Sequence, residues 1–125
     1  MSAAHSPAFL ALVNEARRHI KELSADELPV ALQRAPQAVL IDVREESEYK
    51  AAHLKGAQWL GKGIIERDIE SHHPDRDTLL YLYCGGGYRS ALAADSLQKM
   101  GYRNVWSVDG GWRQLKDLLP VESTS

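Results

Sequence analysis

The chain has 125 residues, of which 44% are hydrophobic and 26% are charged, and this length fits one domain of about 100–150 residues. It is too short for a barrel enzyme of about 250 residues or for a two-domain dehydrogenase. The 15 Lys and Arg residues against 17 Asp and Glu residues give a net charge of −2, which argues against a nucleic-acid binder with its usual basic excess. The single cysteine, Cys84, excludes an internal disulfide, a zinc site with two cysteine ligands and a Cys-x-x-Cys redox pair.

The first residues carry none of the usual targeting or membrane signals. Residues 1–7 contain no lysine or arginine, and the apolar run over 8–13 stops at Asn14, too soon for a signal-peptide core or a membrane span. We therefore expect a cytoplasmic protein without a membrane partner, a location in which a lone reduced thiol is common.

The N-terminal segment predicts an amphipathic helix over residues 7–23. Ser6 can cap this helix, with Pro7 at its first position. Apolar residues then recur at intervals of three and four and form one stripe, which consists of Phe9, Val13, Ala16, Ile20 and Leu23. We expect residues 1–23 to form a helical extension that packs across the domain or contributes to a dimer interface.

The rest of the chain predicts an alternation of helices and strands. Ser24 and Glu27 are spaced as a capping box for a short helix that runs toward residue 34, with Pro29 placed beyond its first turn. Apolar runs predict strands over residues 38–42, 54–60, 78–83 and 104–108. Amphipathic or polar segments predict helices over residues 45–52, 64–71, 89–100 and 112–119. This order indicates a small three-layer α/β domain over residues 24–120 with a mostly parallel sheet, followed by a flexible tail over 121–125.

The residues around Cys84 carry the clearest chemical signal. Cys84 follows a predicted buried strand, and ligands of α/β proteins bind beyond the carboxyl ends of strands. A glycine-rich loop that leads into a helix points several backbone N–H groups at one spot, with the positive end of the helix dipole behind them. The candidate loop consists of Gly85, Gly86, Gly87, Tyr88, Arg89 and Ser90. Such surroundings stabilise an anion, and the nearest one is the Cys84 thiolate, a nucleophile at neutral pH.

A lone cysteine after an apolar strand is more commonly a small buried residue. The combination of strand, cysteine, glycine loop, arginine and helix favours a reactive thiol instead. Arg89 adds a guanidinium group that can bind an anionic substrate.

Four ordered motifs resemble those of rhodanese-type sulfurtransferases. Residues 84–90 resemble the active-site loop of that family, and residues 40–44 with Glu45 and Glu48 resemble its first strand and following helix. A third motif comprises Tyr49, His53, Leu54, Gly56 and Ala57. The fourth comprises residues 101–105 with Val108, Gly110, Gly111 and Trp112. The resemblance covers residues 24–119 and implies a rhodanese-like domain.

The resemblance also implies a reaction. Cys84 would attack the outer sulfur of a sulfane donor such as thiosulfate and become a persulfide, whose outer sulfur residues 85–90 would hold. Cyanide in assays, or a thiol in cells, would then accept that sulfur, and a protein is a further candidate acceptor. No cofactor or metal is implied, and the oligomeric state, monomer or homodimer, is left open.

Two other function classes stay open at this stage. Cysteine phosphatases and arsenate reductases use a Cys-x5-Arg loop that fits a phosphate, whereas this chain has the shorter Cys-x4-Arg. Degenerate rhodanese modules bind partners without chemistry, although the presence of both Cys84 and Arg89 argues against that reading.

Several further side chains are candidates for supporting roles. Asp42 and Arg44 end a predicted strand and can face the loop, where Asp42 can pair with Arg89 and orient it; alternatively, both are simply surface charges. Lys62 and Arg67 flank a segment that can line the pocket and attract an anionic donor, although solvated surface cations are the default.

The remaining polar and aromatic side chains favour structural roles. We interpret His53 as a hydrogen-bonded structural residue rather than a catalytic base. We interpret residues 72–77 as a polar loop rather than a metal cluster. We interpret the three tryptophans as part of the core or of the pocket wall rather than as a stacking platform for nucleic acid. These residues are Trp59, Trp106 and Trp112.

Overall fold

The computed structural model describes residues 5–124, so Met1–Ala4 and Ser125 lie outside the described part of the chain. Its main feature is a five-stranded, wholly parallel sheet in the order β1-β6-β5-β2-β4. The strands span Lys21–Ser24 (β1), Val39–Asp42 (β2), Gln58–Trp59 (β4), Leu80–Tyr83 (β5) and Val105–Asp109 (β6). A second, antiparallel pair joins β3 (His53–Leu54) to β7 (Val121–Glu122).

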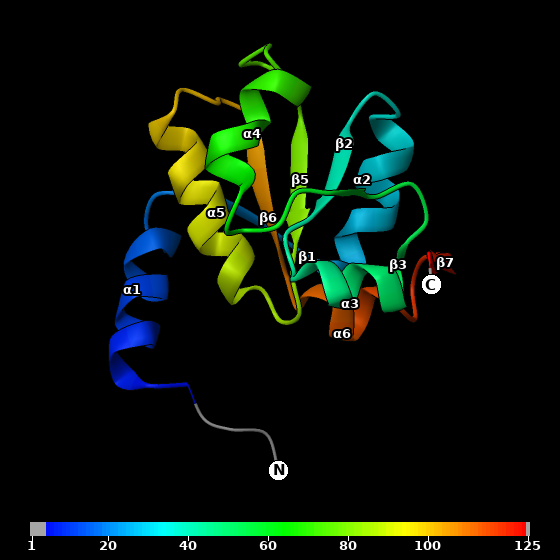
Figure 1. The fold of residues 1–125 in the computed structure, drawn as a ribbon, viewed down its shortest axis with the longest axis horizontal. Helices are drawn as coiled ribbons and strands as arrows, with labels where there is room; N and C mark the ends of the chain where they lie inside the picture. Colours follow the sequence, from blue (N-terminus) through cyan, green and yellow to red (C-terminus); the bar gives the residue numbers. More distant parts are fainter. Residues whose placement is uncertain (1–4, 125) are drawn as a thin grey trace.

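Helices cover both faces of this sheet, which gives the expected three layers (Figure 1). One face carries α1 (Pro7–Arg17), α4 (Ile65–His72) and α5 (Tyr88–Lys99). The other carries the 3-10 turn η1 (Ala25–Glu27), α2 (Leu28–Arg34), α3 (Glu46–Ala51) and α6 (Gly111–Leu115). Because β5 is buried on both faces, its side chains enter both apolar clusters, with Leu82 in one and Tyr83 in the other. This explains why its sequence is a continuous apolar run.

The N-terminal helix is shorter than the sequence predicts. It starts at Pro7 as expected, with the Ser6 hydroxyl accepting a hydrogen bond from the Phe9 N–H at 3.2 Å, but it ends at Arg17. The prediction of helix up to Leu23 is therefore wrong, because residues 21–24 pair with β6 as the edge strand of the sheet. Strand β1 therefore crosses the boundary predicted between the N-terminal extension, which was expected to end at residue 23, and the domain, which was expected to begin at residue 24.

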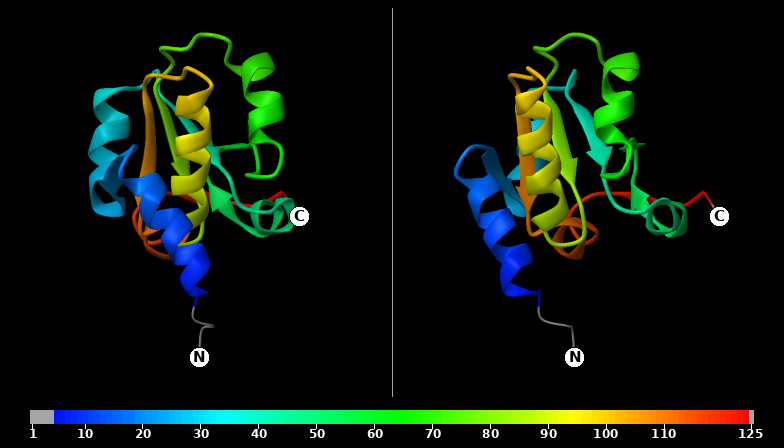
Figure 2. Two further views of the ribbon diagram at one scale, coloured as in Figure 1. Left: turned by 90° about the vertical axis from the view of Figure 1, so that its left-hand side faces the viewer. Right: turned by 60° about the vertical axis from the view of Figure 1, so that its left-hand side comes forward.

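Helix α1 packs along α5 (Figure 2). Val13 and Ala16, two members of the predicted apolar stripe, are buried in this contact. Leu12, which lies at the margin of this stripe, is 58% exposed. The apolar stripe of α1 therefore faces the domain.

Two other local predictions need correction. The capping box forms, with the Ser24 N–H donating to the Glu27 carboxylate at 2.8 Å, but it opens a 3-10 turn, so that Pro29 falls in the first turn of α2, where proline is tolerated. In the tail over residues 121–125 that we expected to fray, Val121 and Glu122 pair with β3 as β7, and the Thr124 N–H donates to the Lys50 carbonyl at 3.1 Å, while Ser125 lies outside the described residues. Within residues 5–124, no helix has the length and apolar character needed to cross a membrane.

Parallel pairing brings the carboxyl ends of all five main strands to one edge of the sheet. At this edge lie Asp42 at the end of β2, Cys84 directly after β5 and Asp109 at the end of β6. The helices α3, α5 and α6 begin here, and so does α1 (Figure 1). The topology thus assembles one site from distant parts of the chain, at the edge where α/β proteins bind ligands.

Candidate active site around Cys84

The Cys84 side chain is buried in the structure, with 1% of the residue exposed. The backbone N–H groups of Gly87 and Ser90 donate to its Sγ at 3.1 and 3.3 Å. The Ser90 Oγ lies 3.5 Å from the sulfur and 2.8 Å from the Ser107 Oγ. Two N–H groups thus donate to the sulfur atom, which in turn donates to the Ser90 Oγ, and the first turn of α5 leaves further N–H groups without an i−4 carbonyl within the helix. This arrangement stabilises negative charge on or next to the sulfur.

Glycines make this geometry possible at two positions. Gly87 has φ +102°, a left-handed conformation that lets the chain turn into α5 so that the N–H groups of Gly87 and Ser90 both donate to the sulfur. A Cβ at Gly111 would overlap the Cys84 carbonyl oxygen. That carbonyl accepts a hydrogen bond from the Trp112 N–H at 2.6 Å, and the Gly85 carbonyl accepts one from the Arg113 N–H at 3.2 Å. The two glycine clusters of the sequence therefore meet in space, with the start of α6 hydrogen-bonded to the Cys84 loop.

Arg89 is held by Glu48 rather than by Asp42. Its Nη1 donates to the Glu48 Oε1 at 2.8 Å, and the predicted Asp42–Arg89 pair is wrong. Burial tends to raise the pKa of Glu48, but hydrogen bonds from Arg89 and from the Glu45 N–H outweigh it and hold that pKa below its usual 4.5. The same hydrogen bond to Glu48 raises the pKa of Arg89. The arginine is therefore a permanently charged group, oriented by α3.

Asp42 and Arg44 form a buried ion pair with each other. The Arg44 Nη2 lies 2.7 Å from the Asp42 Oδ2, and the side chains are 4% and 0% exposed, so the alternative reading as surface charges is wrong. Desolvation tends to lower the pKa of Arg44, while the hydrogen bonds and charge of Asp42 outweigh it and raise that pKa. The Arg44 guanidinium also lies 4.4 Å from the ring centroid of Trp112. The pair thus anchors the end of β2 against α6, beside the Cys84 loop.

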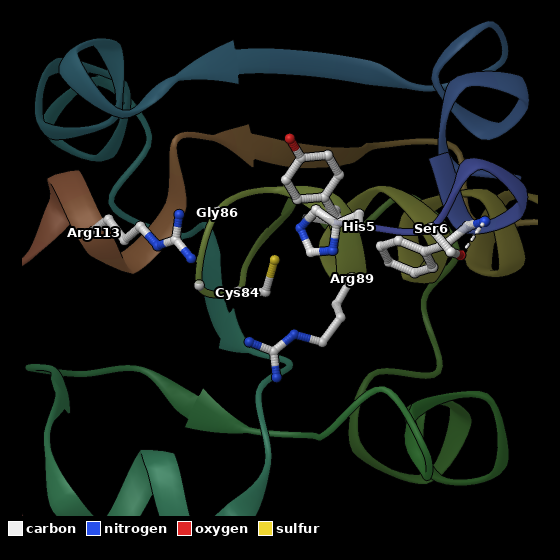
Figure 3. Close-up of a pocket in the computed structure, with 9 residues that line it drawn as sticks. His5, Ser6, Cys84, Gly86, Arg89 and Arg113 are labelled. Atoms are coloured by element: carbon white, nitrogen blue, oxygen red, sulfur yellow. Dashed lines mark hydrogen bonds between the residues drawn. The ribbon is translucent and has the colours of Figure 1, made fainter. Parts of the chain in front are cut away.

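A cavity of about 470 Å³ opens above the cysteine (Figure 3). In Figure 3 the Cys84 sulfur lies between His5, Arg89 and Arg113. The lining residues are His5, Ser6, Phe9, Cys84, Gly85, Gly86, Tyr88, Arg89 and Arg113. Lys62 is exposed and is absent from this lining, which corrects its predicted place in the pocket.

Sequence reasoning missed four side chains of this region: His5 and Phe9 from α1 and its cap, Arg113 from α6, and Glu48 as the partner of Arg89. Only Glu48 carried a signal, because it belongs to one of the motifs that resemble the rhodanese family. The others reach the pocket through packing between helices distant in sequence.

Three histidines outside the pocket have structural surroundings. His53 is 1% exposed, and its Nδ1 lies 2.7 Å from the Tyr49 carbonyl, as expected for a hydrogen-bonded core residue. The rings of His72 and His73 contact the two ends of the Gln58 amide at 3.0 and 2.7 Å. No group of three or more metal-ligating side chains gathers anywhere between residues 5 and 124.

The fold and the site define a class of protein: a small parallel α/β domain with one cysteine in an N–H cradle at the carboxyl edge of its sheet. Residues 24–118 match the family model of the rhodanese-like domain, and the chain belongs to that family. The matched region begins at the end of β1, so α1 lies outside it.

Curated relatives and solved structures agree with this assignment. The chain is 34% identical over 90 residues to the thiosulfate sulfurtransferase GlpE of Pseudomonas entomophila, covering 72% of this chain and 81% of that protein. A solved structure of a thiosulfate sulfurtransferase from Pseudomonas aeruginosa superposes with a TM-score of 0.77 at 25% identity, covering 94% of this chain and 23% of that one.

A third relative carries a different description. A Rhodopseudomonas palustris protein of unknown function, described as a possible tyrosine phosphatase, superposes with a TM-score of 0.79 at 28% identity. The superposition covers 98% of this chain and 99% of that protein.

Proposed function

We propose that this protein is a sulfurtransferase that moves a sulfane sulfur from thiosulfate or a persulfide donor to a thiophilic acceptor through a persulfide on Cys84. The observation that carries the proposal is the convergence of the Gly87 and Ser90 N–H groups on the Cys84 sulfur, beneath a pocket bordered by two arginines. The relatives named as thiosulfate sulfurtransferases support it.

In the first half-reaction, the Cys84 thiolate attacks the outer sulfur of the thiosulfate dianion. The bond between the two thiosulfate sulfurs breaks, sulfite dianion leaves with the electron pair, and Cys84 carries a persulfide anion. Arg89 and Arg113 border the pocket and would attract the donor and stabilise the departing charge. A thiolate nucleophile needs no general base for this attack.

In the second half-reaction, the acceptor attacks the outer sulfur of the persulfide. With cyanide, a carbon–sulfur bond forms, the sulfur–sulfur bond breaks, and thiocyanate leaves while the Cys84 thiolate is restored. Because the chain has no second cysteine to resolve the persulfide, the acceptor must come from outside the chain. We therefore expect ping-pong kinetics.

The loop length favours sulfur chemistry over phosphoryl chemistry. Cys84 and Arg89 are separated by four residues, which makes the ring of N–H groups smaller than the Cys-x5-Arg ring that surrounds a phosphate. The open pocket above Cys84 supports an enzyme over a purely binding module, since a reactant can reach the sulfur.

The test is thiocyanate production from thiosulfate and cyanide by the purified protein. We expect turnover by the wild type and none by Cys84→Ser, with Ser47→Ala, a change outside the pocket, as a control for handling and folding. Hydrolysis of p-nitrophenyl phosphate or reduction of arsenate without thiocyanate production would favour the phosphatase alternative. Absence of all three activities would favour a binding module.

A further inference from the structure

The wall of the Cys84 pocket that faces the two arginines is aromatic and comes mainly from the start of the N-terminal helix. The His5 ring centroid lies 4.5 Å from that of Tyr88 and 5.1 Å from that of Phe9, and the Phe9 and Tyr88 centroids are 6.2 Å apart. These separations are typical of interacting aromatic rings. We define these three side chains as the aromatic wall of the pocket.

Several contacts hold this wall in place. Ser6 caps α1 through the Phe9 N–H, and the buried Val13 and Ala16 fix the helix on α5. Arg17, at the last turn of α1, lies 5.2 Å above the Tyr88 ring and 3.3 Å from Glu22. The helix is thereby tied both to the Cys84 loop and to the edge strand, so its first residues form a built part of the pocket.

The pocket is larger and less polar than an inorganic sulfur donor requires. Its volume of about 470 Å³ lies within the range of roughly 300–1,000 Å³ found for sites that bind organic ligands. Thiosulfate can use the arginines and the N–H cradle, but it has nothing to place against three aromatic rings. A reactant with an anionic sulfur-bearing end and a flat apolar body can occupy both sides of the cavity.

We propose that His5 and Phe9 are specificity-determining residues, which with Tyr88 select sulfur donors that carry a flat apolar group over donors of the same charge that lack one. This inference rests on the proposed function and deepens it. The aryl group would lie against the aromatic wall, while the charged end would lie near Arg89, Arg113 and Cys84. Two of the three rings, those of His5 and Phe9, lie outside the matched family domain, so this selectivity depends on the N-terminal segment as well as on Tyr88 of the domain.

The chemistry of such a donor balances as it does for thiosulfate. The Cys84 thiolate attacks the terminal sulfur of an arenethiosulfonate anion, the sulfur–sulfur bond breaks, and the arenesulfinate anion leaves with the electron pair. Cys84 then carries the persulfide anion, and no proton, oxidant or reductant is needed.

The first measurement compares benzenethiosulfonate with methanethiosulfonate as donors to cyanide. The two anions share charge and reacting group and differ only in the ring. We expect the wild type to prefer the benzene compound by about five-fold or more in kcat/KM, and His5→Ala or Phe9→Ala to lower this ratio toward one. Phe9→Leu, which keeps apolar bulk on α1, should also lower it, whereas the exposed Leu12→Ala on the same helix should not.

The second measurement needs no turnover. Benzenesulfonate and methanesulfonate are compared for their ability to slow alkylation of Cys84 by iodoacetamide. We expect benzenesulfonate to protect at the lower concentration in the wild type and to lose this advantage in Phe9→Ala and Phe9→Leu.

The two measurements separate the two proposals. Sulfur transfer without a preference for the ring, or a preference that survives His5→Ala and Phe9→Ala, would overturn the aromatic wall and leave the sulfurtransferase in place. Protection that depends on the ring, without sulfur transfer from any donor, would overturn the sulfurtransferase and leave the aromatic wall in place. Equal protection by the two sulfonates in the wild type would also overturn the aromatic wall.

Discussion

Two backbone N–H groups, those of Gly87 and Ser90, hold the Cys84 sulfur at the base of a pocket that two arginines border. Gly87 has a left-handed φ, which lets the chain turn from the loop into α5 so that both N–H groups reach the sulfur. At the scale of single residues, the site therefore depends as much on backbone geometry as on side-chain chemistry.

Gly87→Ala should damage both stability and activity. A side chain in the left-handed region costs about 1–2 kcal/mol, and the new Cβ would lie 3.3 Å from the Asp109 Cα. We expect a loss of about 1–3 kcal/mol in the free energy of unfolding in urea, together with slower sulfur transfer. Gly63→Ala is the matched control, since its Cβ would meet nothing within 4 Å. Equal stability of the two variants would contradict the strain at Gly87.

Glu48→Gln should change how stability depends on pH. Because hydrogen bonds from Arg89 depress the pKa of Glu48 below 4.5, the pair contributes stability above about pH 4.5 that is lost as the pH falls through the depressed value. Both side chains are partly exposed, so we expect a wild-type advantage of about 0.2–1 kcal/mol at neutral pH. Urea unfolding at a series of pH values measures it, and an advantage that grows toward acid pH would contradict the pairing.

At the scale of elements, the site is assembled by helices that start at one edge of the sheet. Helix α5 supplies the N–H groups, α3 orients Arg89 through Glu48, α6 contacts the Cys84 loop through Trp112, and α1 closes the pocket with His5. Parallel strand pairing is what places these helix starts together.

Val13→Ala should test whether α1 is an integral part of this assembly. Val13 is fully buried between α1 and α5, so its truncation should lower the free energy of unfolding by about 1–3 kcal/mol while the transition stays cooperative. Its neighbour Leu12 is 58% exposed, and Leu12→Ala should change stability by less than about 0.5 kcal/mol. A negligible effect of Val13→Ala would show that α1 does not pack stably on α5.

The sequence predicted the long, strongly patterned elements and missed the short polar ones. Strand β5 and helix α5 lie within a residue or two of their predicted positions, because a buried apolar run and an amphipathic period are local signals. Strand β1 was missed because Lys21-Glu-Leu-Ser24 is a short edge strand whose single leucine extends the helical stripe of α1. Its pairing with β6, more than eighty residues away, is a tertiary property.

The residues of the site also fall into a group that the sequence predicted and a group that it did not. The cysteine, its glycine loop and the start of α5 are contiguous in sequence, so the sequence predicted their proximity. The partners of the charged side chains were not predictable from the sequence. Arg89 pairs with Glu48, which lies 41 positions away in the chain. The Arg44 side chain turns back at the end of β2 to pair with Asp42. His5 reaches the pocket only because α1 packs on α5.

At the scale of the whole molecule, the local charge at the site differs from the net charge. The chain carries a net charge of −2, yet Arg89 and Arg113 both line the pocket. Since exposed charges act over a screening length of about 10 Å at 0.1 M salt, we expect the charges of the pocket, rather than the net charge, to govern the approach of an anionic donor.

Arg113→Gln should therefore lower kcat/KM for thiosulfate several-fold, and rising salt should narrow the gap to wild type. Lys116→Gln removes the same charge from an exposed position on the following turn of chain and outside the pocket, and it should have little effect. Steady-state kinetics at low and high ionic strength provide the measurement. Equal effects of the two substitutions would indicate that net charge, rather than pocket charge, attracts the donor.

Whether Cys84 carries the transferred sulfur can be read from the mass of the intact protein. After reduction and brief incubation with thiosulfate, we expect the wild type to gain the mass of one sulfur atom on Cys84, to lose it on addition of cyanide, and Cys84→Ser to gain nothing. A wild-type protein that forms thiocyanate without ever gaining that mass, or a Cys84→Ser variant that still transfers sulfur, would contradict this role of Cys84.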